Sequence, residues 1–333
     1  MEQPSAHRSA RPHQSGRAQL KLRSLVFPGL AVALAACRAA AIPESQRWPA
    51  GTAFVTKYVT VDSSRLRVLD VGKGPAVILV HGLAASMYSW RYTIEPLVEA
   101  GYRVITYDNR GFGFSDKPTT GYSNAAYVHL LFGLLDSLSV TDAVLVGHSM
   151  GGAIVADAAV ARPERVRGLV LVDAAGLGVK YPFMLRVARW PIIGPLFDHL
   201  RGRSATAGIL RAIYGDGSLV RQEDVNQYYA PVALPDFGRG LRGVLREFNF
   251  ADLQGRLGGI MTPTLVMWGS RDRVIPQTTG ERMAAELPHS ALARFQRAGH
   301  ALPEESPVAF NRVLIGFLKS GLPAAPANLA LRQ

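Results

Sequence analysis

The spacing of hydrophobic and polar positions changes along this chain, and the changes predict its strands. Two stretches, 54–61 and 66–71, alternate apolar and polar residues, which is typical of strands with one buried face. Later apolar runs are short, continuous and rich in β-branched residues, as expected for parallel strands covered on both faces. These buried strands are expected at Ala76–Val80, Arg103–Tyr107, Ala143–Val146, Gly168–Val172, Pro263–Trp268 and Ala291–Phe295.

Helical patterns separate these apolar runs. They lie near Tyr88–Ala100, Ala125–Leu138, Ala153–Ala161, Gln277–Glu286 and Pro307–Lys319. Strands that alternate with helices in this way predict an α/β fold with a doubly wound, mostly parallel sheet, preceded by a short antiparallel start.

One long interval, between Gly176 and Gly259, has helical patterns and turns but no clear strand. An excursion of this length predicts a helical cap over the carboxyl edge of the sheet, where open α/β folds bind ligands. Its first segment, 181–201, mixes apolar residues with arginines, which is typical either of a basic lid that touches lipid or of a segment packed at the site's mouth. The expected divisions are a signal peptide at 1–36, a tether at 37–53, the core at 54–178 and 259–322, the cap at 179–258 and a tail at 323–333.

The amino-terminal segment has the features of an export signal. Residues 1–23 are polar and basic, residues 24–36 are apolar, and the segment ends in Leu34-Ala35-Ala36-Cys37. This ending resembles the lipobox of bacterial lipoproteins, in which the cysteine is lipidated, and Cys37 is the only cysteine of the chain. The resemblance implies export to the bacterial cell envelope and a lipid anchor at a membrane surface. An ordinary signal peptide or a short uncleaved anchor would give the same pattern.

Composition and charge narrow the classes of partner. The chain has 333 residues, of which 48% are hydrophobic, so it can bury a large core. Its formal net charge of +12 favours anionic partners. A nucleic-acid partner is not expected, since no zinc spacing, aromatic–basic sheet pattern or basic helix occurs, and a membrane surface fits better. No cofactor and no metal are predicted, because the metal-ligand and nucleotide-binding spacings are missing. The oligomeric state stays open.

The strongest chemical motif is Gly147-His148-Ser149-Met150-Gly151, between a predicted strand and a predicted helix. Glycines on both sides of a serine allow a sharp strand-to-helix turn that a Cβ would crowd. Such a turn projects the hydroxyl above the sheet and leaves the next backbone N–H free to meet a developing negative charge. The pattern therefore predicts a nucleophilic serine at position 149.

An activated serine needs a histidine base, and that base needs an acid that fixes its tautomer. Asp272 and His300 each follow a predicted strand downstream of Ser149, so both should lie at the same sheet edge. Asp173, which follows the strand ending at residue 172, is a rival for the acid. The oxyanion hole is expected from the N–H of Met150 and an N–H of the loop after residue 80, for which Leu83 is the candidate.

From about residue 56 to the final helix, the chain resembles the α/β-hydrolase superfamily. The motifs that carry the resemblance are His81-Gly82, Asp108–Ser115, the serine turn, Trp268–Asp272 and Gly299-His300. Residues 101–122 are similar to cofactor-free haloperoxidases, which are serine esterases with perhydrolase side activity. Epoxide hydrolases and haloalkane dehalogenases share the Asp108–Ser115 style but place aspartate at the turn, so the serine of this chain argues against both.

Several polar residues near these motifs have structural interpretations. His81 is expected to order the oxyanion loop and His148 to flank the serine turn. Asp108 and Arg110 are expected to hold loops by an ion pair or hydrogen bonds. The run 116–118 (Asp-Lys-Pro) is interpreted as a solvated turn.

The predicted function is a serine hydrolase of carboxylic esters with an apolar acyl or alcohol part, acting on a small-molecule substrate. A carbon–carbon bond hydrolase is possible on the same fold, although those relatives often carry asparagine before the serine, where this chain has His148. A cofactor-free perhydrolase is a further alternative. From another class, a non-catalytic envelope binding protein is possible, since the fold alone does not decide function.

Overall fold

The computed structural model describes residues 48, 54–178, 201–320 and 329–331. In these residues a single sheet of nine strands runs in the order β1-β2-β4-β3-β5-β6-β7-β8-β9. The strands are β1 (Lys57–Val61), β2 (Ser64–Val71), β3 (Ala76–Val80), β4 (Arg103–Tyr107), β5 (Ala143–His148), β6 (Val166–Val172), β7 (Thr264–Gly269), β8 (Ser290–Phe295) and β9 (Leu329–Leu331).

The strand pairing matches an α/β fold with an antiparallel start. β2 pairs antiparallel with both β1 and β4, and every later pair is parallel. β3 lies between β4 and β5, so the chain changes its direction of travel across the sheet at this point. Open α/β sheets bind ligands at the carboxyl ends of the strands beside such a switch. The segment that follows β5 is therefore well placed for a site.

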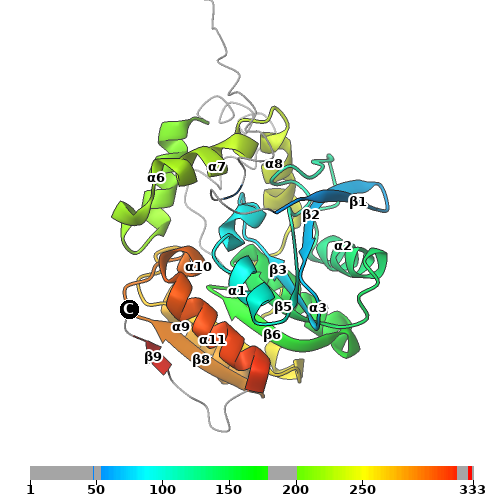
Figure 1. Ribbon diagram of the computed structural model, residues 1–333, viewed down its shortest axis with the longest axis vertical. Helices are drawn as coiled ribbons and strands as arrows, with labels where there is room; N and C mark the ends of the chain where they lie inside the picture. The colour runs from blue at the N-terminus through cyan, green and yellow to red at the C-terminus, as the bar shows by residue number, and fades with distance from the viewer. Residues whose placement is uncertain (1–47, 49–53, 179–200, 321–328, 332–333) are drawn as a thin grey trace, which may run out of the picture. The chain divides into compact units, whose positions relative to one another are not determined.

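Helices cover both faces of the sheet (Figure 1). α2 (Asn124–Ser137), α3 (Met150–Ala161) and α9 (Gln277–Glu286) pack on one face, and α1 (Ile94–Glu99) and α11 (Pro307–Ser320) on the other. Side chains of β3 alternate between the two cores: Ile78 and Val80 enter the first, and Val77 and Leu79 the second. A strand buried on both faces must be apolar throughout, as β3 is.

The described part of the predicted cap, 201–258, is helical and contains no strand. Its helices are α6 (Arg203–Ile213), α7 (Gln222–Val232) and α8 (Phe237–Glu247), which group together at one edge of the sheet (Figure 1). The amphipathic segment 181–201 lies outside the described residues except for Arg201, as does Cys37 with the signal.

Three boundaries differ from the prediction. The helix expected near 88–100 is divided into a 3₁₀ turn, Met87–Trp90, and α1. Pro96 is the cause, because its ring and missing N–H are tolerated only in the first turn of a helix, which forces a start near residue 94. β1 begins at Lys57 rather than at residue 54. The predicted tail contributes β9, which pairs parallel with β8.

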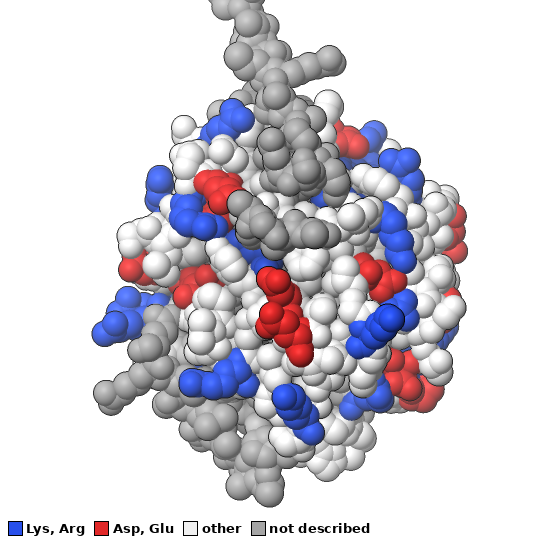
Figure 2. All heavy atoms as spheres, viewed as in Figure 1, with Lys and Arg blue, Asp and Glu red and all other residues white. Residues whose placement is uncertain are grey.

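Charged residues of both signs are distributed over the face shown in Figure 2. On the face shown in Figure 2, acidic side chains lie between basic ones, so the excess of positive charge is not gathered into one patch there. In the part of the chain that the structure describes, no helix combines the length and the apolar character needed to cross a bilayer.

Candidate active site

Ser149 occupies the sharp turn between β5 and α3. Its φ of 54° and ψ of −118° are rare for a residue with a Cβ, so the turn stores backbone strain. Hydrogen bonds to the end of β6 and to the segment after it hold the turn in place: the N–H of Ser149 donates to the carbonyl of Val172 at 3.0 Å, and its carbonyl accepts from the N–H of Ala175 at 2.9 Å. These hydrogen bonds therefore stabilise the strained backbone conformation of Ser149.

The glycines of the motif are required by close backbone approach. A Cβ at Gly147 would lie 2.3 Å from the carbonyl oxygen of Gly151, and a Cβ at Gly151 would lie 2.2 Å from the carbonyl oxygen of Val80. Neither position can hold a side chain without moving the backbone. The spacing of glycines in the sequence thus reflects the packing of α3 against β3 and β5.

Ser149, His300 and Asp272 come together at the carboxyl edge of the sheet. Nε2 of His300 lies 3.0 Å from Oγ of Ser149, and Nδ1 of His300 lies 2.7 Å from Oδ2 of Asp272. The second oxygen of Asp272 accepts the N–H groups of Val274 and Ile275 at 2.7 and 2.9 Å. The His300 and Asp272 side chains are 7% and 0% exposed, so the hydrogen-bond chain is shielded from water. Such a chain can transfer the serine proton to the imidazole.

Asp173, the rival acid, has a different environment. Its Oδ1 accepts the N–H of Gly269 at 2.8 Å, whereas the described hydrogen bonds of the His300 ring go to Asp272 and Ser149. Complete burial, reinforced by the nearby carboxylate of Asp272, raises the pKa of Asp173 well above its ordinary value. Without a hydrogen bond to the His300 ring, and with its charged form disfavoured by burial, Asp173 is poorly placed to stabilise an imidazolium charge. It instead supports the end of β7, from which the Asp272 loop departs.

His81 and His148 support the backbone around the serine. Nε2 of His81 accepts the N–H of Asn109 at 2.8 Å, so its Nδ1 carries the proton and donates to the carbonyl of Gly82 at 2.8 Å. Nε2 of His148 lies 2.6 Å from the carbonyl oxygen of His300. Burial, together with the neighbouring His300, lowers the pKa of His148 to about 3, so this ring is neutral and donates from Nε2.

The two backbone N–H groups expected to form the oxyanion hole belong to the residue after Ser149 and to a loop that lies beside it. The N–H of Met150 is the first of α3, a position without an acceptor inside its own helix. The loop that contains Leu83 lies beside the serine, because a Cβ on Gly82 would be 2.9 Å from the Cβ of Ser149. The His81–Gly82 hydrogen bond holds this loop.

One group of possible metal ligands is found among the described residues: His148, Asp173 and His300 each offer an atom within 4.8 Å of the others. Both ring nitrogens of His300 and Nε2 of His148 already take part in the hydrogen bonds described above. Coordination of a metal here would break the link between His300 and Ser149 or Asp272.

Asp108 and Arg110 both hold loops, as expected, but each does so with partners other than the other residue. Asp108 accepts the N–H groups of Met87 and Phe114, both at 2.8 Å, and its ion partner is Arg67 at 3.5 Å, not Arg110. Arg110 donates instead to the hydroxyl of Ser64 and the carbonyl of Gly121. Sequence reasoning missed Arg67, because it occupies a polar position of an alternating strand, where an exposed side chain is expected.

The interpretation of 116–118 as a solvated turn is wrong for Lys117. This lysine is buried, and its Nζ donates to the carbonyl of Ser115 at 2.9 Å and lies 3.9 Å from Asp236 of the cap. Burial lowers its pKa. The cap covers this side chain, and a covering segment more than a hundred residues away leaves no local trace in the sequence.

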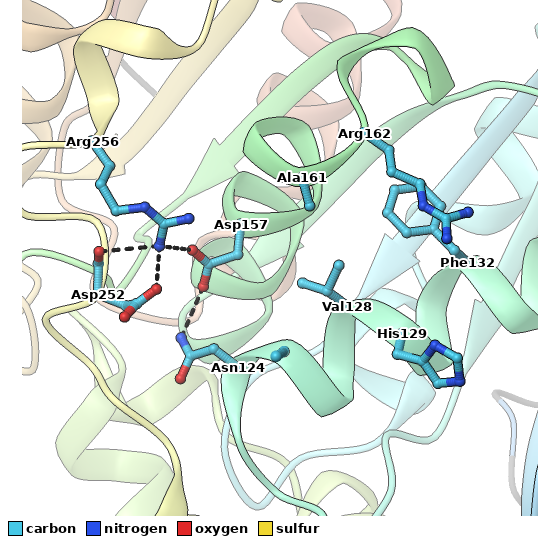
Figure 3. A pocket seen from close by; sticks show the side chains of 10 residues that line it. Asn124, Val128, His129, Phe132, Asp157, Ala161, Arg162, Asp252 and Arg256 are labelled. Carbon is cyan, nitrogen blue, oxygen red and sulfur yellow. Dashed lines mark hydrogen bonds and ion pairs between the residues drawn. The ribbon is translucent and has the colours of Figure 1, made fainter.

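A hollow of about 280 Å³ lies apart from these residues, along α2 and α3 (Figure 3). At one end the Asp157 carboxylate accepts Nδ2 of Asn124 and Nη1 of Arg256, both at 2.8 Å, and Arg256 also pairs with Asp252 (Figure 3). Burial raises the pKa of Asp157 to about 6. Because Asp252 and Arg256 belong to the segment that returns from the cap, this cluster joins that segment to the core.

Comparison with known proteins places the chain in a family. Residues 75–307 match the family described as alpha/beta hydrolase fold. A 2-hydroxy-6-oxo-6-phenylhexa-2,4-dienoate hydrolase of Burkholderia cepacia is 32% identical over 283 residues, which are 80% of this chain and 97% of that protein.

Two solved structures are similar across most of their length. A bromoperoxidase from Bacillus anthracis has a TM-score of 0.70 and 28% identity, with 80% of this chain and 100% of that one covered. A membrane phospholipase A, a bacterial virulence factor, has a TM-score of 0.69 and 26% identity, with 80% and 86% covered. By the match over residues 75–307 and the identity to the Burkholderia enzyme, the chain belongs to the alpha/beta hydrolase fold family.

Proposed function

We propose that this protein is a serine hydrolase that cleaves carboxylic esters with an apolar acyl or alcohol part. The observation that carries the proposal is the hydrogen-bond chain from Oγ of Ser149 through the His300 ring to Asp272, with distances of 3.0 and 2.7 Å. A nucleophile, a base and an orienting acid in this order can carry out acyl transfer at neutral pH.

The geometry suggests the role of each group. Ser149 Oγ attacks the ester carbonyl while Nε2 of His300 takes its proton. Asp272 holds the ring with its Nδ1–H toward the carboxylate and stabilises the imidazolium. The N–H groups of Met150 and Leu83 receive the oxyanion, and His300 then returns the proton to the leaving alcohol. Water, deprotonated by the same ring, releases the acyl group from Ser149.

An apolar ester is supported by the groups around the serine and by one structural relative. Leu83 and Ala84 in the adjoining loop are half-buried apolar residues that pack against the core. The structural relative is the membrane phospholipase A, at 26% identity, whose name describes an enzyme that acts on phospholipids.

A second candidate is hydrolysis of a carbon–carbon bond. It is favoured by the 32% identity to the Burkholderia cepacia dienoate hydrolase. Both reactions would use the same serine and base, so the described geometry is compatible with either. A perhydrolase activity is a third use of the same groups, supported by the 28% identity to the bromoperoxidase.

A substrate panel separates these activities. We expect the purified protein to hydrolyse p-nitrophenyl esters, with higher kcat/KM for medium-length acyl chains than for acetate. It should act weakly on a 2-hydroxy-6-oxodienoate and show little peroxide-dependent halogenation with acetate. Turnover of the dienoate with none of the esters would replace the proposal by the carbon–carbon reaction. Inactivity on the whole panel together with no fluorophosphonate labelling would favour a binding protein.

We also propose export to the bacterial cell envelope and anchoring by a lipid on Cys37. The support is the sequence alone: the apolar segment 24–36, its Leu-Ala-Ala-Cys ending and the lack of any other cysteine. Several acyl chains on one residue give stable membrane attachment, whereas a single chain binds only marginally. Cys37→Ser should move the protein from the membrane to the soluble fraction, and unchanged fractionation would contradict lipidation.

A further inference from the structure

The carboxylate of Glu305 binds backbone on both sides of His300. Glu305 is the last residue of α10 (Leu302–Glu305) and is largely buried. Its Oε1 accepts the N–H of Gly299 at 2.9 Å and the N–H of Ala301 at 3.2 Å. One side chain therefore holds the residues that precede and follow His300.

The same carboxylate also binds the cap. Oε2 of Glu305 accepts the N–H of Gly215, just beyond the end of α6, at 2.7 Å. The N–H of His300 itself donates to the carbonyl of Ile213, the last residue of α6, at 2.8 Å. Three consecutive N–H groups, 299–301, are thus satisfied by Glu305 or by the cap.

Packing also joins the His300 loop to the end of α6. A Cβ on Gly299 would lie 2.2 Å from the backbone nitrogen of Gly215, so the two backbones touch. Ala301 is 2% exposed and belongs to the small apolar cluster of the cap. That cluster comprises Ala207, Leu210, Tyr214, Val220, Val225 and Ala301. The residue next to the base is therefore part of the core of the cap.

We infer that Glu305 is a positioning residue that holds the His300 backbone and the end of α6 together, so that the seating of the cap sets the place of the catalytic base. This inference rests on the proposed function, because it assumes that His300 is the catalytic base that Glu305 positions. Displacement of a catalytic group by about 1 Å can lower a rate by about 100-fold, so loss of this carboxylate should affect turnover more than substrate binding.

The test is Glu305→Gln, with Glu247→Gln as the matched control. Glu247, at the end of α8, likewise accepts two backbone N–H groups across the cap–core boundary, from Gly121 at 3.0 Å and Tyr122 at 2.8 Å, but it does not bind the His300 loop. Both substitutions remove a charged acceptor of backbone N–H groups, so a general loss of stability should appear in both.

We expect Glu305→Gln to lower kcat for a p-nitrophenyl ester by about 10- to 100-fold, with KM changed less than about threefold. The kcat is expressed per site that a fluorophosphonate labels at completion, which removes any unfolded fraction from the comparison. Glu247→Gln should keep kcat per labelled site within about twofold of wild type, even if its unfolding temperature falls as much as that of Glu305→Gln.

Equal kcat per labelled site in Glu305→Gln and wild type would overturn the inference, as would an equal loss in both variants. If Glu305→Gln does not fold, Glu305→Asp, which keeps the charge on a shorter side chain, takes its place with the same expected loss. Failure of the proposed function is a separate result, because wild type itself would then show neither turnover nor labelling.

Discussion

Two buried polar clusters lie four residues apart along the chain, at His300 and at Glu304, and they are built in opposite ways. The reactive cluster consists of Ser149, His300, Asp272 and Asp173. The cap-anchoring cluster consists of Arg91, Asp224, Glu304, Tyr88 and Tyr228.

The reactive cluster retains strain and an unpaired atom. Ser149 and Asp173 both have positive φ, at 54° and 44°. Oδ2 of Asp173 is buried and has no hydrogen-bond partner among the described residues. Strain and unpaired polar groups of this kind are costly, and they concentrate where a structure does chemistry.

The cap-anchoring cluster has no residue at positive φ and pairs opposite charges, although Nε of Arg91 is also buried without a hydrogen-bond partner. Arg91, only 1% exposed, forms ion pairs with Asp224 of α7 and Glu304 of α10. The hydroxyls of Tyr88 and Tyr228 donate to these two carboxylates. Because it joins the cap to the core, this cluster is expected to determine stability, whereas the reactive cluster determines rate.

The largest predicted effect separates the two acids of the reactive cluster. Asp272→Asn should lower kcat by about 10⁴-fold, because the His300 ring loses the partner that fixes its tautomer and stabilises its charge. Asp173→Asn should lower kcat by less than about tenfold. The amide keeps the shape of the side chain, and its oxygen can still accept the N–H of Gly269. Steady-state kinetics on a p-nitrophenyl ester distinguish them, and the reverse ranking would make Asp173 the acid.

A smaller effect, on stability rather than on rate, is expected in the cap-anchoring cluster. Arg91→Met removes the cation paired with buried Glu304, leaves Asp224 paired only with the half-exposed Arg221, and should lower the free energy of unfolding by about 3–5 kcal/mol. Arg282→Met removes an exposed ion pair with Glu286 and should change it by less than about 1 kcal/mol. Urea denaturation measures both, and a similar small change in the two variants would show that Arg91 does not anchor the cap.

The smallest effect is a pH dependence at Asp157, where the cap returns to the core. A carboxyl whose pKa is raised to about 6 in the folded state binds its proton more tightly there than in the unfolded chain. Its contribution to stability is therefore complete below its ordinary pKa and is lost as the pH rises through about 6.

The pH effect is measured by comparison with Asp157→Asn. The difference in unfolding free energy between wild type and this variant should move in favour of wild type as the pH falls from 6.5 to 4. Its size should not exceed about 3 kcal/mol, the lower end of the range for Arg91→Met, because the pKa is raised from 3.8 to about 6. A difference that does not change with pH would contradict the raised pKa.

Much of the fold and the placement of the candidate site could be predicted because their signals are local. Ser149 lies within a five-residue glycine motif, and Asp272 and His300 each follow a recognisable strand. Topology then brings strand ends to one edge, so three distant residues meet without any sequence signal of their contact.

What could not be predicted depends on partners far away in the sequence. The burial of Lys117 comes from the cap, more than a hundred residues later, and the interaction of Glu305 with Gly215 spans 90 residues. The division of the helix expected near residues 88–100 is a different kind of error, because its cause, Pro96, is visible in the local sequence. The helical hydrophobic pattern continues across Pro96, but the proline determines where the helix begins.

The most direct test of the Ser149–His300–Asp272 assignment is intact-mass and peptide mass spectrometry after incubation with a fluorophosphonate. We predict one covalent adduct per chain, located on Ser149 and lost in Ser149→Ala without unfolding. An adduct retained in Ser149→Ala, or an ester-hydrolysing wild-type protein that is never labelled at this serine, would contradict it.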